Sequence, residues 1–431
     1  MTAQQLQSNL IRTLWLGFFQ VFLVIMPIAV PFFQSKGLSM QEVFSLQALF
    51  GLVVLISEVP SGYLADLIGR RQTLIIGAVF AGIGQSLLLT ADGFWTLALF
   101  ELALGISHSL ISGADIALLY DTELALGRGA QAQRQVVGRL FSFRTFSEAA
   151  AAVVCSVLLL TASMDWVIYL QAAVGWLPLF FALTLIEPPM QRLDQTSHTA
   201  NMLRICRFLL GSSSVLRLTV LSLCIWSLTT FYAVWLLQKL WELQGIPLQH
   251  FGYLWAGLCV VAALSGRYAH AVEKRLGTTT LLVLIGLAPA LGYLGLDGFG
   301  VVGAYVASLS FFISRGFGMV VLRDALNSRV PSEFRATANS LTSFGFRGVF
   351  VITGPIVGYS FDLWGMEVTL LALALGTVVI FVTLIVPLIY ATRRLDSETI
   401  EPSERIEGVE PGAARVAVSG CSVSVVEEPS K

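Results

Sequence analysis

The chain has 431 residues, of which 56% are hydrophobic and only 12% are charged, and its formal net charge is −1. Because soluble globular proteins carry roughly 25% charged residues, this composition excludes an ordinary soluble protein and indicates a membrane protein. The balanced charge also gives no reason to expect a nucleic acid as a partner.

Apolar stretches long enough to cross a lipid bilayer recur along nearly the whole chain. A hydrocarbon core about 30 Å thick requires roughly 20 mostly apolar residues per helix. The sequence therefore predicts an all-α membrane protein with twelve transmembrane helices. The first of them lacks a small-residue cleavage site, so we expect a retained helix and not a signal peptide. The predicted ranges are 11–33, 41–63, 72–91, 94–120, 137–161, 164–186, 215–238, 248–271, 278–296, 299–325, 337–361 and 366–391.

Basic residues are distributed unevenly between the two ends of these helices. Lys36 and Lys239 fall in loops at one end, whereas most of the 26 lysines and arginines fall in loops or termini at the other. Since loops rich in Lys and Arg remain in the cytoplasm, the second end is predicted to be cytoplasmic and to carry both termini. We therefore expect a multi-pass protein of the cytoplasmic (inner) membrane.

A long polar interruption divides the predicted helices into two groups of six. Residues 1–187 form the predicted N-terminal half, 188–214 a cytoplasmic linker and 215–392 the C-terminal half. Within the linker, four residues share one helical face, so a short interfacial helix is expected; they are Met202, Cys206, Leu209 and Leu210. Residues 393–431 are rich in Glu, Ser, Pro and Gly and are predicted to be a disordered cytoplasmic tail.

The two halves share short sequence echoes. GYLAD begins at Gly62 and GRYAH at Gly266, while FSFR ends at Arg144 and FGFR at Arg347, at nearly the same offset. Two matches at one offset favour a duplicated six-helix unit, which is typical of transporters.

The loop after the second predicted helix holds an unusual density of charge in the segment GYLADLIGRR. Asp66 and Arg70 are four residues apart and can pair on one helical face. Gly62 and Gly69 permit a tight turn or a close backbone approach. Together with Arg71, these residues fit every position of the pattern G-x-x-x-D-x-x-G-R-K/R. In this loop and in its twelve-helix topology, the chain resembles the major facilitator superfamily of secondary transporters.

The resemblance implies that this cluster is a cytoplasmic gate. In that superfamily the cluster latches the two halves together when the cavity faces outward, with the Asp near the start of the eleventh helix. Arg70 could also reach Asp121, and Glu58 lies one helical turn before the motif, so both acids are included in the predicted gate. The alternative is a short polar turn whose charges only fix the topology.

Ionisable residues also occur inside the predicted helices, where burial costs roughly 2.5–3.5 kcal/mol per charged group. The fourth helix carries Glu101, His108 and Asp115 at spacings of seven, with Gly105 and Ser112 between them. At this spacing all five lie along one stripe. The stripe indicates either a polar cavity wall, with His108 or a carboxylate as proton carrier, or a helix–helix interface held by small and polar residues.

The remaining intramembrane charges are divided asymmetrically between the halves. Arg144 and Glu148 on the fifth helix can pair with each other, or Arg144 with Asp115, whereas Arg315 and Arg347 have no acid in their own helices. Unpaired arginines inside a membrane require an anion. Either acids of the first half supply it, as a charge lock between the halves, or the substrate is an anion or zwitterion.

Aromatic residues on the seventh helix, Trp226, Phe231, Tyr232 and Trp235, could stack on an organic substrate, but such residues more often belong to a core or an interfacial belt. Two features depart from the pattern of drug–proton antiporters in the superfamily. Glu101 occupies the position of their fourth-helix arginine, and the fifth helix has no Gly-Pro. The segment SGADIALLYDTEL resembles poorly characterised bacterial members that are presumed to be exporters.

Several other functions have no motif in this sequence. The five cysteines are scattered, no phosphate-binding loop of the form G-x-x-x-x-G-K-[ST] occurs, and no nucleophile–base pair lies within the helices. We therefore expect no enzyme activity, no metal and no cofactor, and a gradient must drive any active transport.

The prediction is a secondary active transporter, expected to be a monomer, that exports a small organic solute by alternating access and uses protons as coupling ion. One alternative is a proton-independent facilitator or importer of a small organic anion or zwitterion. Another is a non-transporting membrane receptor. The residues predicted to line or lock the cavity are Glu101, His108, Asp115, Arg144, Glu148, Arg315 and Arg347.

Overall fold

The computed structural model describes residues 2–188, 207, 209–211, 213–298, 300–331 and 334–394, and all regular secondary structure in these ranges is helical. We call residues 2–188 the first half and residues 213–394 the second half. Most of the predicted linker and the predicted tail lie outside the described residues.

The first half contains nine α-helices and two short 3₁₀ helices, η1 and η2. The α-helices are α1 (Ala3–Gln20), α2 (Ala29–Ser35), α3 (Met40–Ile68), α4 (Arg70–Leu87), α5 (Phe94–Ile111), α6 (Ala114–Ala125), α7 (Ala130–Leu159), α8 (Met164–Val174) and α9 (Leu177–Thr184); the 3₁₀ helices are η1 (Met26–Ile28) and η2 (Leu88–Thr90).

The second half contains longer helices, two of which are continued or interrupted by π-helical turns, η3 and η6. Its elements are α11 (Ser214–Leu221), η3 (Ser222–Trp226), α12 (Ser227–Leu243), η4 (Leu248–His250), α13 (Phe251–Leu276), α14 (Thr278–Gly298), α15 (Gly300–Arg329), α16 (Arg335–Ile380) and η6 (Phe381–Ile385).

The helices agree with the predicted all-α membrane fold. Ten helices in the described residues are long and apolar enough to span a membrane. The first predicted span is not among these ten, because it is broken into α1 and α2. Another predicted span is not counted separately, because α16 joins two predicted spans across a kink at Gly365. The architecture is therefore consistent with twelve spans.

The first predicted span, 11–33, differs most from its expected form. Helix α1 begins earlier, at Ala3, and ends at Gln20, and the chain resumes helical structure only at Met26. Pro27 lies at the start of η1, where its missing N–H is tolerated. In the break, the N–H of Ile25 donates to Gln171 Oε1 at 3.3 Å. A side chain thus satisfies backbone that the helix leaves free, as a membrane interior requires.

The fourth predicted span, 94–120, is also interrupted. Helix α5 ends at Ile111, and Gly113 has a φ of +91° before α6 begins at Ala114. The stripe predicted from Glu101 to Asp115 therefore does not continue along one helix. Asp115 lies in the first turn of α6 and has different neighbours from Glu101.

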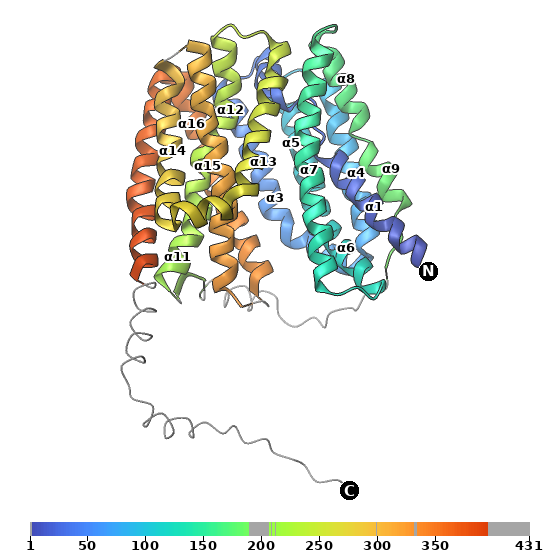
Figure 1. Ribbon diagram of the computed structural model, residues 1–431. Coiled ribbons are helices and arrows are strands. Elements are labelled where there is room, and N and C mark those ends of the chain that lie inside the picture. The colour runs from blue at the N-terminus through green and yellow to red at the C-terminus, as the bar shows by residue number, and fades with distance from the viewer. Residues whose placement is uncertain are drawn as a thin grey trace, which may run out of the picture.

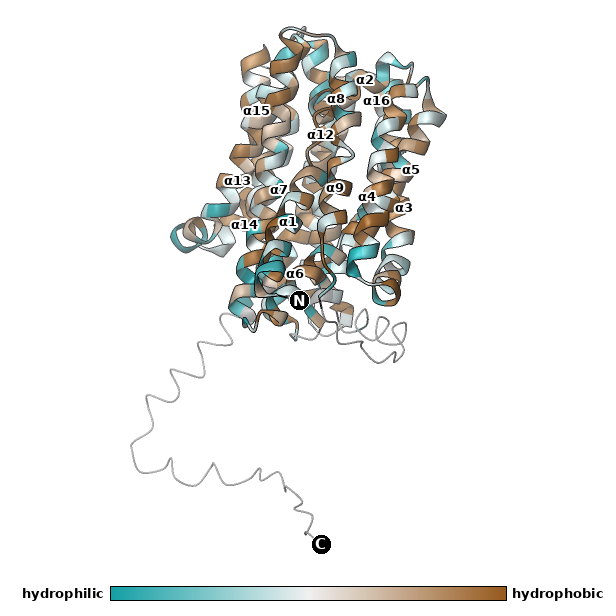
Figure 2. Cartoon of the chain, turned by 90° about the vertical axis from the view of Figure 1, so that its right-hand side faces the viewer, coloured by the Kyte–Doolittle hydropathy of each residue, from teal (hydrophilic) through white to brown (hydrophobic). Residues whose placement is uncertain are grey.

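The two halves stand side by side, with α1 to α9 on one side and α11 to α16 on the other (Figure 1). The N-terminus and the last described residues lie at the same end of the bundle, which we call the terminal end; the opposite end is the far end. Figure 2 shows hydrophobic residues over the long helices and hydrophilic residues gathered near the terminal end, around α6.

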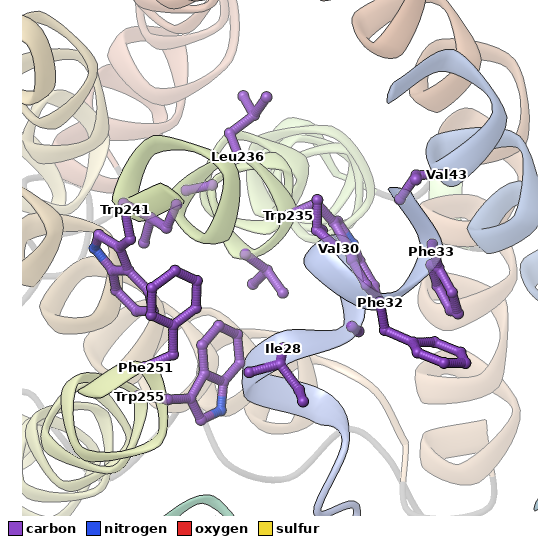
Figure 3. Close-up of a cluster of buried hydrophobic side chains, with 14 of the residues drawn as sticks. Ile28, Val30, Phe32, Phe33, Val43, Trp235, Leu236, Trp241, Phe251 and Trp255 are labelled. Atoms are coloured by element: carbon purple, nitrogen blue, oxygen red, sulfur yellow. The ribbon is translucent and has the colours of Figure 1, made fainter. Parts of the chain in front are cut away.

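A large apolar core joins the halves towards the far end. In Figure 3 the segment η1–α2 lies against α12 and α13, with Ile28 beside Trp255 and Val30 beside Trp235. These four side chains are at most 5% exposed. Burial of such large side chains stabilises the closed far end by roughly 1.5–3 kcal/mol each.

Candidate functional site

A cavity of about 330 Å³ lies between the halves and is lined by α3, η3, α12, α15 and α16. Its second-half wall includes the π-helical turn η3, a feature that is frequent at functional sites. No acidic residue is among the described residues that line it. The lining residues are Gln47, Phe50, Gly51, Leu223, Trp226, Ser227, Thr230, Phe231, Arg315, Met319, Arg323, Thr342, Ser343, Phe346, Arg347 and Phe350.

Arg347 makes a contact across the two halves. Its Nη2 lies 3.4 Å from Nε2 of His108 on α5. Because a guanidinium can only donate, a hydrogen bond between them requires Nε2 to accept and the imidazole proton to lie on Nδ1. The guanidinium carbon lies 5.9 Å from the ring centre of Phe50, within cation–π range. Nε of Arg347 is buried and has no hydrogen-bond partner.

A second cavity, of about 120 Å³, lies in the first half behind Phe50 and His108. Its walls include the broken stretch at Val21 and Leu23. The Oε1 atom of Gln85, which also lines it, is buried and has no hydrogen-bond partner. Phe50 and His108, whose ring centres are 5.7 Å apart, thus separate an amide-lined cavity from the arginine-lined one.

Glu101 does not line the larger cavity but contacts a residue that does. Its side chain is buried, with 3% exposed, and Oε1 accepts a hydrogen bond from Gln47 Nε2 at 2.6 Å. Gln47 itself lines the cavity. The Glu101 carboxyl is therefore linked to the cavity through the amide side chain of Gln47.

Asp115 and Arg144 form an ion pair inside the first half and line neither cavity. Arg144 Nη2 donates to Asp115 Oδ2 at 2.5 Å and to Gln20 Oε1 at 2.9 Å. Asp115 is completely buried. Glu148, one turn after Arg144, does not join this pair and instead lies beside Cys259 of α13.

The predicted cavity set is thus divided by the structure. Arg315 and Arg347 line the larger cavity, and His108 lies at the junction of the two. The structure contains no ion pair between the halves among the described residues. The predicted charge lock is therefore not formed in this conformation.

The charged loop at the terminal end is organised around Arg70. Its side chain pairs with Asp66, and its Nε lies 3.8 Å from Asp121 Oδ2, so the predicted partners are present. The backbone N–H groups of Arg70 and Arg71 donate to the two carboxylate oxygens of Glu187, both at 2.7 Å. Glu187 thus caps α4, where the helix dipole favours a negative charge.

Two members of the predicted gate have other surroundings. A Cβ added at Gly62 would meet no atom within 4 Å, so the terminal end of α3 is not packed against the second half at this position. Glu58 interacts electrostatically with Arg347 without forming an ion pair. It belongs with the cavity arginines more than with the loop.

The far end is closed by polar contacts between the halves. Asp362 of α16 accepts hydrogen bonds from the backbone N–H groups of Met40 at 3.0 Å and Gln41 at 2.7 Å, at the start of α3. Its carboxylate therefore satisfies two free donors of the α3 N-terminus.

Two amide or hydroxyl side chains add similar cross-half bonds. Gln238 Oε1 on α12 accepts from Val30 N at 2.9 Å, and Ser156 Oγ on α7 accepts from Tyr253 N of α13 at 3.0 Å. Each joins a side chain of one half to the backbone of the other, so closure depends on close backbone approach.

Two glycines of the second half allow this approach. A Cβ at Gly252 would clash with the carbonyl oxygen of Ala152, and one at Gly358 would lie 2.6 Å from Cα of Gln41. Any larger residue at these positions would keep the halves apart at the far end.

A family model described as Major Facilitator Superfamily matches residues 13–345. The chain belongs to this superfamily. The family predicted from the loop after the second span is therefore confirmed, and the chain is a multi-pass membrane protein with the fold of a secondary transporter.

Solved structures of other transporters share this fold. The nucleoside transporter NupG is 14% identical, with a TM-score of 0.72 and coverage of 88% of this chain and 98% of that chain. A bacterial homologue of the human lysosomal transporter Spinster, in an inward-facing and unoccupied conformation, is 14% identical, with a TM-score of 0.73 and coverage of 91% and 98%. No curated protein sequence matches the chain.

The sequence did not predict several residues of the site in this major facilitator superfamily (MFS) protein. Gln47, Phe50 and Arg323 line the cavity, while Asp362 and Glu187 each cap a helix far away in the sequence. Asp362 and Glu187 gave a weak signal, because an acid at the end of an apolar stretch is a candidate cap for another helix. Gln47 and Phe50 gave none, since apolar and amide residues are common on all faces of such helices.

Proposed function

We propose that this MFS transporter moves a small organic solute by proton-coupled alternating access. The observation that carries the proposal is a sealed far end combined with an arginine-lined cavity between the halves. Polar and apolar contacts seal the far end, while the arginine-lined cavity extends from Phe50 towards Arg323, near the terminal end of α15. Together with the predicted cytoplasmic termini, these features support a proposed conformation that is open towards the cytoplasm.

The proposed proton carrier is Glu101. It is a buried carboxyl with no ion pair among the described residues, and Gln47 connects it to the cavity. Uptake and release of a proton at such a site change the charge near the substrate without a second bound ion. One elementary charge moved across the membrane gains about 2.3 kcal/mol per 100 mV, which is enough to drive roughly 50-fold accumulation.

The direction of transport has two candidates. The sequence analysis predicts export. The arginines of the cavity favour the opposite direction, because a proton on Glu101 removes a negative charge near an anion site and so strengthens anion binding. Binding couplings are reciprocal, so proton and anion would move together, which under an inward proton gradient means uptake.

The function can be tested in proteoliposomes that contain a pH-sensitive dye. Organic anions, zwitterions and cations of similar size are added outside in turn, with and without a protonophore. We expect one class to produce a proton flux, inward for cotransport and outward for exchange. Solute movement that does not change with the protonophore would indicate a proton-independent facilitator. If no class of solute moves, the protein would be a non-transporting receptor.

Glu101→Gln is expected to abolish proton-coupled accumulation and to retain exchange of labelled solute across the membrane. The amide can still accept the hydrogen bond from Gln47, so the cavity keeps its shape, but it cannot carry a proton. The measurement compares pH-driven uptake with solute counterflow. Glu242→Gln, in an exposed pair with Lys239, is the control. Normal accumulation by Glu101→Gln would contradict this assignment.

Asp362→Asn is expected to shift the protein towards the conformation that is open at the far end. The asparagine side chain has no negative charge and can accept only one of the two hydrogen bonds from the α3 N-terminus. The closed far end is then less stable by about 1 kcal/mol, which corresponds to roughly a fivefold change in population. Spin labels at Ser163 and Leu243 would report the longer distance. Glu367→Gln, an exposed acid near the same end, should leave the distances unchanged; equal shifts in both variants would refute a specific role of Asp362.

A further inference from the structure

Three arginines of the second half share the larger cavity. Arg315 and Arg323 come from α15 and Arg347 from α16, and no acidic residue joins them among the described lining residues. Arg315 and Arg347 are half-buried and Arg323 is exposed, and a guanidinium that is removed from water is stabilised by an anion. The cavity therefore has a local excess of positive charge.

No described acidic residue forms an ion pair with these arginines. Neither Arg315 nor Arg323 forms a hydrogen bond or an ion pair with a described residue, and Arg347 contacts only Nε2 of His108 and the ring of Phe50. The buried Nε of Arg347 has no partner at all. Glu58 acts on Arg347 only at longer range. Guanidinium donors are thus left for a bound molecule.

Five aromatic residues form another part of the cavity wall, beside polar residues such as Gln47, Thr230 and Ser343. Phe231 packs edge-on against Phe346 and Phe350, with ring centres 5.3 Å and 4.9 Å apart, and Phe50 and Trp226 complete the wall. Such rings hold flat apolar groups through burial and edge-to-face contacts. The volume of about 330 Å³ is at the lower end for small-molecule sites, which span roughly 300–1,000 Å³.

From these observations we propose that the substrate is a soluble organic anion with a flat apolar body of one or two rings. Arg315, Arg323 and Arg347 hold its carboxylate, sulfonate or phosphate group, and the aromatic wall holds the ring. This inference rests on the proposed transport function, since it assigns the substrate class of the same cavity.

The test uses full-length protein in phosphatidylcholine nanodiscs and three probes with one ring system: naphthoate, naphthamide and naphthylmethylammonium. Binding is measured by calorimetry. We expect naphthoate to bind at least about tenfold more tightly than the uncharged amide, because a charge-assisted hydrogen bond contributes this much, and the cation to bind most weakly. Added phosphatidylglycerol should not displace naphthoate.

Single variants assign the effect to residues. Arg315→Gln, Arg323→Gln and Arg347→Gln should each weaken naphthoate binding about tenfold and leave naphthamide binding unchanged. Arg329→Gln, on the same helix α15 but outside the cavity, is the matched control. If the Arg347 variant does not fold, the variants of the half-buried Arg315 and the exposed Arg323 decide the question.

The outcomes separate this inference from the proposed function. Equal binding of acid and amide, preference for the cation, an equal loss in Arg329→Gln, or competition by phosphatidylglycerol alone would each overturn the anion site. Proton-coupled flux of a cation would do so while leaving the transport function intact. Anion binding without any solute flux would instead preserve the site and refute transport.

Discussion

Arg347→Ala is expected to abolish transport, by a factor of roughly 100 or more, while the protein still inserts and folds. The guanidinium lines the cavity and also contacts His108 in the other half, so its loss removes both the anion partner and a cross-half contact. Two charge-assisted hydrogen bonds of about 1.5–3 kcal/mol each account for this magnitude. Initial rates of solute flux, normalised to the amount of folded protein, provide the measurement.

The controls for Arg347 separate charge from geometry. Arg347→Lys retains the charge but not the planar fork, and should recover only part of the rate if the substrate is bound by two donors at once. Arg329→Ala is the control, because Arg329 lies on α15 outside the cavity. Full activity of Arg347→Ala would exclude this arginine from the transport cycle.

Asp115→Ala is expected to destabilise the protein by about 3–5 kcal/mol, the usual cost of removing one partner of a buried ion pair. Arg144 would keep only its bond to Gln20, and its Nε is already buried without a partner. Thermal unfolding in detergent should show the loss, with Glu242→Ala, from an exposed pair, changing stability by less than about 1 kcal/mol.

The double variant Asp115→Ala/Arg144→Met tests the cause of this instability. Replacing both charges by apolar groups removes the buried unpaired charge, so the double variant should be more stable than Asp115→Ala alone. Additive destabilisation by the two changes would mean that Asp115 acts through packing and not through its charge.

The helical fold and the family could be predicted from the sequence because both depend on local patterns. The length of the apolar stretches gives the spans, and the spacing from Gly62 to Arg71 gives the family. The pairing of Asp115 with Arg144 was also among the predicted partners, since intramembrane charges have few alternatives.

The parts that could not be predicted depend on tertiary contacts. The break after Gln20 is stabilised by Gln171, far away in the sequence, and hydropathy gives no sign of it. The interruption at Gly113 separates Asp115 from Glu101, although their spacing alone places them on one face. Arg315 and Arg347 were predicted to line or lock the cavity, but nothing in the sequence around Arg323 reveals that it lines the same cavity.

The glycines at the far end also have a practical consequence for structure determination. Gly252 and Gly358 let backbone meet backbone between the halves, so hydrogen atoms alone occupy the contact. A bulky residue at either position would act as a wedge and hold the molecule with its far end open. Such a variant would provide a homogeneous sample of the opposite conformation, in which the charged loop around Arg70 could be seen engaged with the second half.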